Sequence, residues 1–536
     1  MTSGTATNLR ESNRFAAIPI RPAIAGAVAT LAALGLSELA AGELSAPSLV
    51  AAIGTVVIDN QPAGAKDIVV SIFGQNDKLA LELLIVIVSV LIGAGLGLVA
   101  RRQFAIGAGG FVVFAGLGFF AAMSDPSASA TTVVIVAGVA AIAGVQVLSW
   151  LLGPAPAVDG GVAGATGAAI TKSSGRSMPD WSRRGFLIRS GSVAVASVAA
   201  GLAGRAWLEA ARATPTTGAT PIPPASQVAT LPAGSSLQVT GLTPLVVPNS
   251  DFYRIDTALL SPNVDAASWS LRIHGLVDRE TTLTFAELVG LPLIEQYVTI
   301  ACVSNEVGDK LVGNAKWTGP RLRDVLAIAG VQSSATQLVG RAVDGWTAGM
   351  PTSWVMDPAR EPMIAVKMND EVLPRIHGFP ARLIVPGLYG YVSATKWLAE
   401  LELTTWESFN GYWVPLGWSK EGPILTQSRI DVPRSGQSVP AGRVAIAGVA
   451  WAPDRGISKV EIAVDGEWRD CTLSQPISAA TWVQWTYAWD AAASGAGPHT
   501  IEVRATDGTG EVQTADRTPP APDGARGHHT IQVQAG

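Results

Sequence analysis

Long apolar stretches are confined to the first 207 residues of the chain. A helix of about 20 apolar residues is long enough to cross the hydrocarbon core of a membrane. The pattern therefore predicts five transmembrane helices, at residues 20–40, 80–100, 104–123, 131–152 and 187–207. A further apolar run, "SLVAAIGTVVI" (Ser48–Ile58), is too short to span, and we expect it to be re-entrant or to lie at the membrane interface.

Positive charge alternates between the ends of these predicted helices. Basic residues precede the first helix, separate the second from the third and precede the fifth: Arg10, Arg14, Arg21, Arg101, Arg102, Lys172, Arg176, Arg183 and Arg184. The connection "SDPSASA" between the third and fourth helices carries none, although Lys66 and Lys78 weaken the pattern slightly in the first external loop. Because short basic loops stay in the cytoplasm, we expect the N-terminus inside and everything after about residue 208 outside.

The stretch "SRRGFLIRSGSVAVASVAAG" (Ser182–Gly201) resembles a twin-arginine export signal. It has paired arginines, a Phe-Leu pair after one intervening glycine, and then a moderately apolar helix. That export route carries folded proteins, often with a cofactor already bound. The alternative is an ordinary basic flank of a transmembrane helix.

After residue 243 the pattern changes to short apolar strands, turns and helical stretches. The last 110 or so residues alternate apolar and polar positions with period two, as in "ISKVEIAVDGEW" and "HTIEVRATDG", which is typical of an immunoglobulin-like sandwich. A Gly/Ala/Ser-rich linker and a Pro/Thr/Ala-rich tether with little to pack separate the parts. The predicted organisation is a four-helix transmembrane region (1–152), a cytoplasmic linker (153–185), a fifth transmembrane helix (186–208), a tether (209–242), an oxidoreductase domain (243–425) and an immunoglobulin-like domain (426–536).

Composition supports a membrane-bound protein and excludes several classes. The chain is 48% hydrophobic and only 15% charged, whereas about a quarter of a soluble domain is charged. Its net charge of −5 does not indicate a protein that binds nucleic acid. Two cysteines allow at most one disulfide.

Most short motifs have structural explanations. The glycine cluster "GAGLG" (Gly93–Gly97) lies in a predicted membrane helix, where small residues allow close helix packing. No histidine precedes His274, so the membrane helices cannot hold a bis-histidine haem, and no zinc spacing is present. For the adjacent His528 and His529 we expect a surface role. Cys471 is expected to be a small buried hydrophobe.

Cys302 is different, because it ends an apolar strand and opens a polar loop in "ACVSNEVGDKLVGNAKWTGPRL". It can be buried filler, half of a disulfide, a nucleophile or a ligand for a soft metal. Downstream, "NDEVLPRIHGFPARLIVPGLYGYVSATKWLAELEL" gathers cations and hydroxyls that suit an anionic, phosphate-bearing ligand: His377, Arg382, Ser393, Thr395 and Lys396.

Cys302 and this cluster together resemble the sulfite oxidase superfamily of molybdenum enzymes. The resemblance covers roughly residues 243–536 and rests on "TPLVVPNSDFYRID", "ACVSN...GNAKWTGPRLRDVL", "DGWTAGMP", "LPRIHGFPARLIVP", "KWL" and "GYWVPLGW". The C-terminal "ISKVEIAVDGEWRD" resembles the family's molybdopterin dimerisation domain, which implies a possible homodimer.

The resemblance implies a molybdenum–molybdopterin cofactor and a role for each matching residue. The metal would be bound by the pterin dithiolene and by the thiolate of Cys302. The phosphate would be held by His377, Arg382, Ser393, Thr395 and Lys396. The pterin would be lined by Asn249, Phe252, Tyr253, Arg254 and Asp344, and Tyr412 falls near the family's active-site tyrosine.

This chain also departs from the family pattern. Sulfite oxidases follow the cysteine with an Asn-Arg-Arg run, where this sequence has Asn305, Glu306 and Val307. The lost positive charge argues against a small dianion as substrate. The family's haem domain has no counterpart here, so electrons would pass to a separate partner.

The sequence thus predicts a multi-domain protein with transmembrane helices, an α+β molybdopterin domain of the sulfite oxidase type and an all-β immunoglobulin-like sandwich. Its expected function is oxo transfer on a small substrate by a membrane-anchored, extracytoplasmic molybdenum oxidoreductase. A sulfite oxidase and a reductase of substrates such as sulfoxides both remain open. A different class is a membrane-tethered immunoglobulin-like binding or sensing protein with a degenerate cofactor domain.

Overall fold

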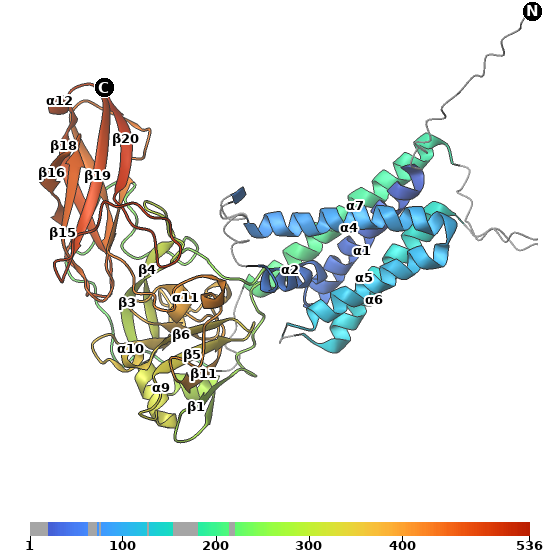
Figure 1. The fold of residues 1–536 in the computed structure, drawn as a ribbon, viewed down its shortest axis with the longest axis horizontal. Coiled ribbons are helices and arrows are strands. Elements are labelled where there is room, and N and C mark those ends of the chain that lie inside the picture. Colours follow the sequence, from blue (N-terminus) through green and yellow to red (C-terminus); the bar gives the residue numbers. More distant parts are fainter. Residues whose placement is uncertain (1–19, 63–71, 74–76, 126–127, 154–180, 214–219) are drawn as a thin grey trace, which may run out of the picture. The chain divides into compact units, whose positions relative to one another are not determined.

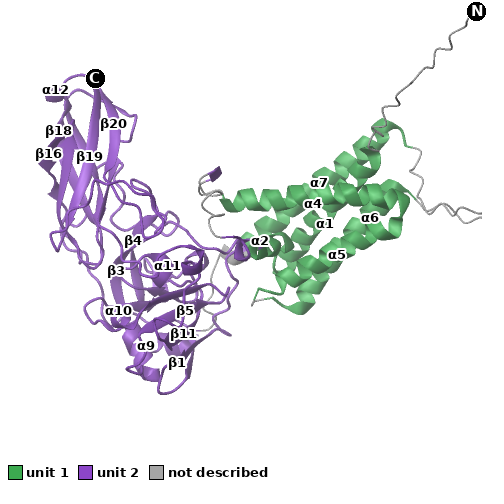
Figure 2. Cartoon of the chain, in the orientation of Figure 1, with its two compact units in different colours: residues 1–56, 75–209 green, residues 57–74, 210–536 purple. Residues whose placement is uncertain are grey.

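The computed structural model describes residues 20–62, 72–73, 77–125, 128–153, 181–213 and 220–536. It divides into two compact units, residues 1–56 with 75–209 and residues 57–74 with 210–536 (Figure 2). Most of the predicted cytoplasmic linker (154–180) and six residues of the predicted tether (214–219) lie outside the described residues.

The first unit is helical (Figure 1). Its helices are α1 (Ile20–Leu44), α2 (Leu49–Asp59, whose last residues belong to the second unit), α4 (Asp77–Arg102), α5 (Phe104–Ala122), α6 (Ala130–Leu152) and α7 (Arg183–Ala213). Among the described residues, five of these are long and apolar enough to cross a membrane, which confirms the five predicted helices. The 11 residues of α2 are too few to span, also as predicted.

Helix α1 packs closely against its neighbours through glycine. In the apolar window of α1, 56% of residues are buried, against 17–33% in the other four long helices. A Cβ atom added to Gly26 would lie 2.0 Å from the carbonyl oxygen of Gly93, and one added to Gly97 would lie 2.1 Å from that of Pro22. Only glycine permits this approach, so the small-residue interpretation of "GAGLG" is confirmed.

A buried carboxylate fixes the start of α2. Glu38, 8% exposed, accepts a hydrogen bond from the Ser48 hydroxyl (2.5 Å) and another from the Val50 backbone N–H. The Ser48 oxygen in turn accepts from the Ala51 N–H (3.1 Å). These contacts satisfy two of the four N–H groups that a helix leaves unpaired at its first turn.

The second unit begins with a mixed α/β domain. One sheet has the order β2 (Thr281–Thr284), β1 (Ser270–Gly275), β11 (Leu398–Thr404), β5 (Gln337–Ala342), β6 (Thr347–Pro351), and only its β1–β11 pair is parallel. A second has the order β3 (Leu293–Ala301), β4 (Val312–Pro320), β8 (Lys367–Met368), β9 (Glu371–Val372), and β7 (Met363–Ala365) pairs with β10 (Arg382–Ile384). Short helices connect the strands: α8 (Phe285–Val289), α9 (Leu322–Ala329), α10 (Thr352–Met356), η2 (Arg375–His377), α11 (Gly390–Ser393) and η3 (Val414–Leu416).

A β-sandwich follows. Its sheets are β12 (Gln427–Val432), β14 (Arg443–Trp451), β18 (Val483–Asp490), β17 (Thr472–Leu473), and β13 (Ser438–Val439), β20 (His529–Ala535), β19 (Gly497–Asp507), β15 (Ile457–Val464), β16 (Glu467–Asp470), with one short helix, α12 (Ala491–Ser494). Every second residue of β19 from His499 to Asp507 is buried, as expected for a strand with one face on the core. The predicted fold class is confirmed.

The α/β domain and the sandwich share one hydrophobic core. Val449, Trp451 and Trp482 of the sandwich belong to the same buried cluster as the α/β domain. The Trp482 indole N–H donates to the carbonyl of Leu245 (2.9 Å), and its backbone N–H donates to the hydroxyl of Thr299 (2.8 Å). The two domains are therefore packed as one body.

Two details differ from expectation. The Pro-rich segment, expected to pack little, is hydrogen-bonded to this body at Ser226, Ala229 and Leu237. The surface role expected for His528 is wrong, because its ring is buried between Glu502 (2.7 Å) and the carbonyl of Gln513 (2.9 Å). His529 is half-buried against the backbone N–H of Ile430 (3.0 Å).

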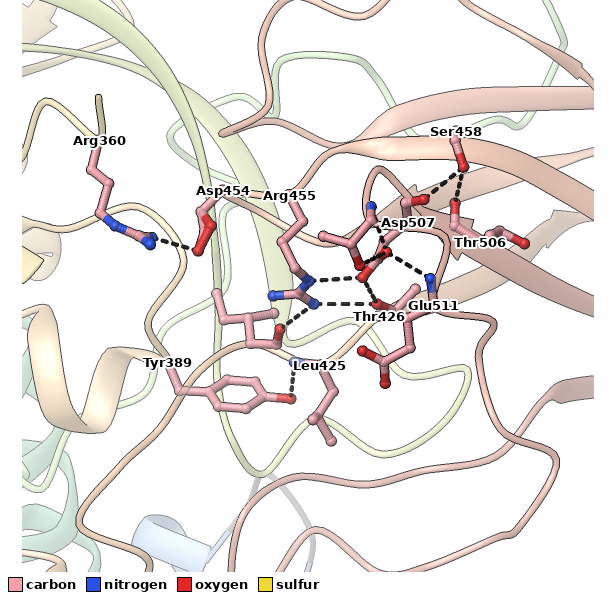
Figure 3. A network of polar contacts seen from close by, with 12 residues as sticks. Arg360, Tyr389, Leu425, Thr426, Asp454, Arg455, Ser458, Thr506, Asp507 and Glu511 are labelled. Carbon is pink, nitrogen blue, oxygen red and sulfur yellow. Dashed lines mark hydrogen bonds and ion pairs between the residues drawn. The ribbon is translucent and has the colours of Figure 1, made fainter.

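A polar network joins the two domains around Asp507 (Figure 3). The fully buried Asp507 accepts hydrogen bonds from Arg455 (2.8 Å), the Thr426 hydroxyl (3.0 Å) and the Thr509 hydroxyl (2.7 Å). Burial alone would raise the pKa of this carboxyl, but the hydrogen bonds from Arg455, Thr509 and Thr426 hold its pKa well below the ordinary value. Arg455 also donates to the carbonyl of Ile424 (3.0 Å).

We expect Asp507→Asn to destabilise the protein most at neutral pH, by roughly 3 kcal/mol, the cost of breaking a buried ion pair. Because the folded-state pKa is lowered, the stabilisation is present above the ordinary pKa of about 3.8 and is lost as the pH falls through the folded value. Thermal unfolding followed from pH 7 downwards should show the gap between wild type and variant narrowing in acid. Asn in place of the exposed Asp516 is the control, and an equal effect of both changes would contradict the assignment.

Candidate active site

One cavity of about 100 Å³ in the α/β domain collects the chemically active side chains. Its lining comes from the segment before β1, the end of β3, the β5–β6 turn, η2, β10, α11 and the chain on either side of β11. Of the predicted site residues, seven line it: Phe252, Tyr253, Cys302, Asp344, His377, Arg382 and Lys396.

The thiol of Cys302 lies at the edge of the sheet, where β3 ends. Cys302 is 8% exposed and follows the last strand residue, Ala301, which pairs with Val312 of β4. Its backbone N–H donates to the carbonyl of Leu311 (2.9 Å). The strand pairing therefore fixes the backbone that carries the sulfur.

Arg382 is a buried cation. It is 4% exposed and donates to the carbonyl of His377 (3.0 Å), while its guanidinium lies 5.0 Å from the centre of the Trp317 ring. Among the described residues it has no carboxylate partner, and its Nε atom has no hydrogen bond. Burial lowers its pKa to about 10. A buried charge without a counter-ion is costly, so this position is suited to an anionic ligand.

Two neighbours orient this corner of the cavity. The His377 imidazole Nε2 lies 2.9 Å from the carbonyl oxygen of Asn249, and burial, followed by the charges of Arg382 and Lys396, lowers the pKa of His377 to about 4. The ring is neutral at pH 7, with Nε2 as the donor. Phe252 meets His377 edge-on (5.6 Å) and stacks on Tyr253 (5.3 Å).

Two acidic side chains, Asp256 and Asp344, also line the cavity. Asp256, with a side chain 4% exposed, bonds to Lys396 (2.6 Å) and Arg254 (2.9 Å). Burial raises the pKa of Asp344 to about 6, and the charge of Asp256 adds to this rise. Burial lowers the pKa of Lys396 to about 8 against the opposing effect of Asp256. Asp344 and Lys396 therefore have pKa values on either side of neutral pH.

Five predicted site residues lie outside the lining. The side chain of Asn249 is bonded to Glu371 and Asn369, and Arg254 is exposed beside Asp256. The hydroxyls of Ser393 and Thr395 donate to the carbonyls of Tyr389 (2.9 Å) and Gly340 (3.4 Å). The half-buried Tyr412 is not in the lining, but the next residue, Trp413, is.

Part of the cavity lining was not predicted from the sequence. Asp256 and several aromatic residues line the cavity without having been singled out: Trp346, Tyr391, Trp397, Trp413 and Trp418. Most lie inside the motifs that carried the family resemblance, so the signal was present, but a motif does not show which side chains face inward. Glu306, which stands in the run where sulfite oxidases have Asn-Arg-Arg, is exposed and outside the lining.

The cavity combines a soft thiol, a guanidinium that lacks a counter-ion and groups with pKa values near neutrality. A thiolate is a ligand for soft or high-valent metals, and a guanidinium binds phosphate. These donors fit a metal cofactor with a phosphate group. No cluster of His, Cys, Asp and Glu able to hold a bare metal ion occurs in the part of the chain that the structure describes.

Comparison with known families identifies both domains of the second unit. Residues 258–413 match the family described as "Oxidoreductase molybdopterin binding domain", and residues 427–503 match the "Bacterial Ig domain". The predicted resemblance to the sulfite oxidase family is confirmed.

Two curated relatives agree with the family match. Human mitochondrial sulfite oxidase is 29% identical in an alignment of length 288 that covers 45% of this chain and 52% of the relative. NADH nitrate reductase 1 of Oryza sativa subsp. japonica is 34% identical in an alignment of length 177 that covers 28% of this chain and 19% of the relative. The chain thus spans about half the length of the sulfite oxidase it matches. A solved structure, the sulfane dehydrogenase SoxCD from Paracoccus pantotrophus, is 22% identical with a TM-score of 0.46, over 57% of this chain and 86% of the other.

We expect Arg382→Met to weaken binding of the phosphate-bearing ligand about 10- to 150-fold, which corresponds to the loss of one charge-assisted hydrogen bond of about 1.5–3 kcal/mol. Methionine keeps the packing on Trp317, so the fold should persist by circular dichroism while the molybdopterin content of the purified protein falls. The matched control is Arg375→Met, which alters an equally buried arginine outside the lining. Full retention of ligand by Arg382→Met would place the phosphate site elsewhere.

Proposed function

Because residues 258–413 are a molybdopterin-binding domain of the sulfite oxidase family, followed by an Ig-like domain, we propose that this chain is a membrane-anchored molybdenum oxidoreductase. Its substrate is a small molecule, and its electrons pass to or from a separate protein or carrier. The observation that carries this proposal is that one cavity contains both Cys302 and Arg382, a buried cation with no carboxylate partner among the described residues.

Molybdenum bound to molybdopterin supplies two-electron oxygen-atom transfer. In this chain, Cys302 would provide the protein ligand to the metal. Arg382, whose guanidinium donates to the His377 carbonyl (3.0 Å), would hold the phosphate. Phe252 and Tyr253, stacked on each other, form an apolar wall for the pterin. The Ser393 and Thr395 hydroxyls already donate to backbone carbonyls, so the charge of Arg382 would carry the main contact with the phosphate.

Oxygen exchange between a substrate and water requires protons to move, and Asp344 is the group placed to move them. Its carboxyl lines the cavity and has a pKa raised to about 6 by burial and by Asp256. It therefore takes up and releases a proton near neutral pH. The Asp256–Lys396 ion pair (2.6 Å) also acts on this carboxyl, because the charge of Asp256 raises the pKa of Asp344 and that of Lys396 lowers it.

The substrate we propose is neutral or singly charged, such as a sulfoxide or an N-oxide. The cavity is lined by many aromatic side chains. Of the cations that line it, Arg382 would bind the phosphate and Lys396 is paired with Asp256. An arginine expected after the cysteine in sulfite oxidases is replaced by Val307.

The catalytic half is proposed to lie outside the cytoplasm. The basic flanks of the five membrane-length helices support this orientation, and the twin arginines Arg183 and Arg184 at the start of α7 are proposed to act as an export signal. A homodimer through residues 426–536 stays a prediction.

The test of function is molybdenum content and turnover in wild type and in Cys302→Ser. We expect about one molybdenum per wild-type chain and higher kcat/KM for uncharged sulfoxides than for sulfite, with artificial electron donors or acceptors. A neutral hydroxyl is a poor ligand for a metal already bound by sulfur, so Cys302→Ser should lose turnover and keep most of its pterin. Cys471→Ser is the control and should resemble wild type. Absence of molybdenum, in cells able to make the cofactor, would favour a binding or sensing protein.

The orientation is tested with a reporter enzyme that is active only after export. Fused at Gly536 or within "SDPSASA", it should be active, and fused within residues 154–180 it should be inactive, because the positive-inside rule keeps that basic segment in the cytoplasm. Activity of the fusion within 154–180 would overturn the five-helix topology.

A further inference from the structure

The residue proposed to bind the metal opens a ten-residue hairpin loop, 302–311, between β3 and β4. The α/β domain itself holds the near end of this loop. The Cys302 carbonyl accepts from the Asn305 N–H (3.1 Å), and the side-chain oxygen of the buried Asn305 accepts from the Leu311 N–H (2.7 Å). The loop is thus closed across its base.

The far end of the same loop is held by the C-terminal domain. The carbonyl of Asp309 accepts a hydrogen bond from the Arg429 guanidinium (2.8 Å). Gly308, with φ +89°, lies so close to the His529 ring that an added Cβ would be 2.4 Å from its Cδ2 atom. Both contacts come from the sandwich, on β12 and β20.

Arg429 and His529 are themselves fixed. Arg429 is 5% exposed and binds Asp431 (2.6 Å) and the hydroxyl of Thr243 (2.9 Å). The Nδ1 atom of His529 accepts the N–H of Ile430 (3.0 Å), so this nitrogen is unprotonated. The two side chains therefore present a rigid surface to residues 308 and 309.

The segment that leads into this domain supports a second wall of the cavity, next to the Asp507 network (Figure 3). The Ile424 N–H donates to the carbonyl of Gly387 (2.8 Å), and the Tyr389 N–H donates to that of Gly422 (2.7 Å). Residues Gly390 and Tyr391, which follow directly, line the cavity. Two separate parts of the site thus rest on the sandwich or on the segment leading into it.

We propose that the C-terminal domain is a positioning element of the reaction centre: Arg429 and His529 hold the far end of loop 302–311 and thereby fix the Cys302 thiol. This proposal rests on the proposed function in one respect, the role of Cys302 as a metal ligand. The contacts of Arg429 and His529 with the loop are independent of that function. A purely structural role would stabilise the domain without affecting the thiol.

The experiment measures the alkylation rate of Cys302 by iodoacetamide in the cofactor-free, full-length protein in detergent, with Cys471→Ser as background. Because Cys302 is 8% exposed, the reagent reaches it when the loop opens. We expect Arg429→Met and His529→Ala each to raise the rate by about tenfold or more, the effect of losing one hydrogen bond or packing contact of about 1.4 kcal/mol. Arg429→Lys, which can still donate to Asp309, should restore part of the protection.

The matched control is His528→Ala, which removes a buried histidine of the same domain that contacts Glu502 and Gln513 rather than the loop. It should lower the unfolding temperature without changing the alkylation rate. In the loaded enzyme, Arg429→Met and His529→Ala should alter the paramagnetic resonance spectrum of molybdenum, and His528→Ala should not.

Equal alkylation rates in the loop-contacting variants and in His528→Ala would overturn the positioning role. This outcome is separate from failure of the proposed function. If wild-type protein contains no molybdenum, the enzyme proposal fails, whereas the alkylation comparison still decides whether the sandwich holds the Cys302 loop.

Discussion

The buried guanidinium of Arg382 is the constraint on which the site depends. It is packed on Trp317 and bonded to the His377 carbonyl, with no carboxylate partner among the described residues. Without a ligand this charge is poorly compensated, and a bound phosphate would compensate it. The surroundings of Arg382 leave room for such an anion. His377 is neutral and adds no second charge beside Arg382, and Asp256 is paired with Lys396 and Arg254 rather than with Arg382.

The same cavity also holds acidic groups, because Asp256 and Asp344 line it together with Arg382. Two uncompensated carboxylates close to a phosphate would repel it, but Asp256 is bonded to Lys396 and Arg254. The cavity thus combines a cation suited to an anion with a carboxyl, that of Asp344, suited to proton exchange. A single fold provides both because the segment before β1, the β5–β6 turn and the chain before β11 converge on it from different sheets and loops.

Much of the architecture could be predicted from the sequence, because apolar runs of membrane length and period-two alternation are local signals. Cys302, His377, Arg382 and Lys396 were also identifiable, since their motifs have a characteristic order. The orientation of the side chains could not be predicted in this way. Ser393 and Thr395 bond to backbone carbonyls, and Glu306 is exposed, because these outcomes depend on tertiary packing that no short pattern encodes. The contacts of His529 with Gly308 and of Arg429 with Asp309 join segments more than 100 positions apart, so no local pattern predicts them.

The core shared by the two domains has a consequence for the order in which the protein is made. Trp482 completes the packing around Leu245, a residue 237 positions earlier in the chain. Synthesis proceeds from the N-terminus, and domains usually fold as they emerge. The helices can therefore be complete while the α/β domain still lacks Trp451 and Trp482 from its core. On the ribosome, the anchor exists before the reaction centre does, and the cavity acquires its final shape only when nearly the whole polypeptide has been translated.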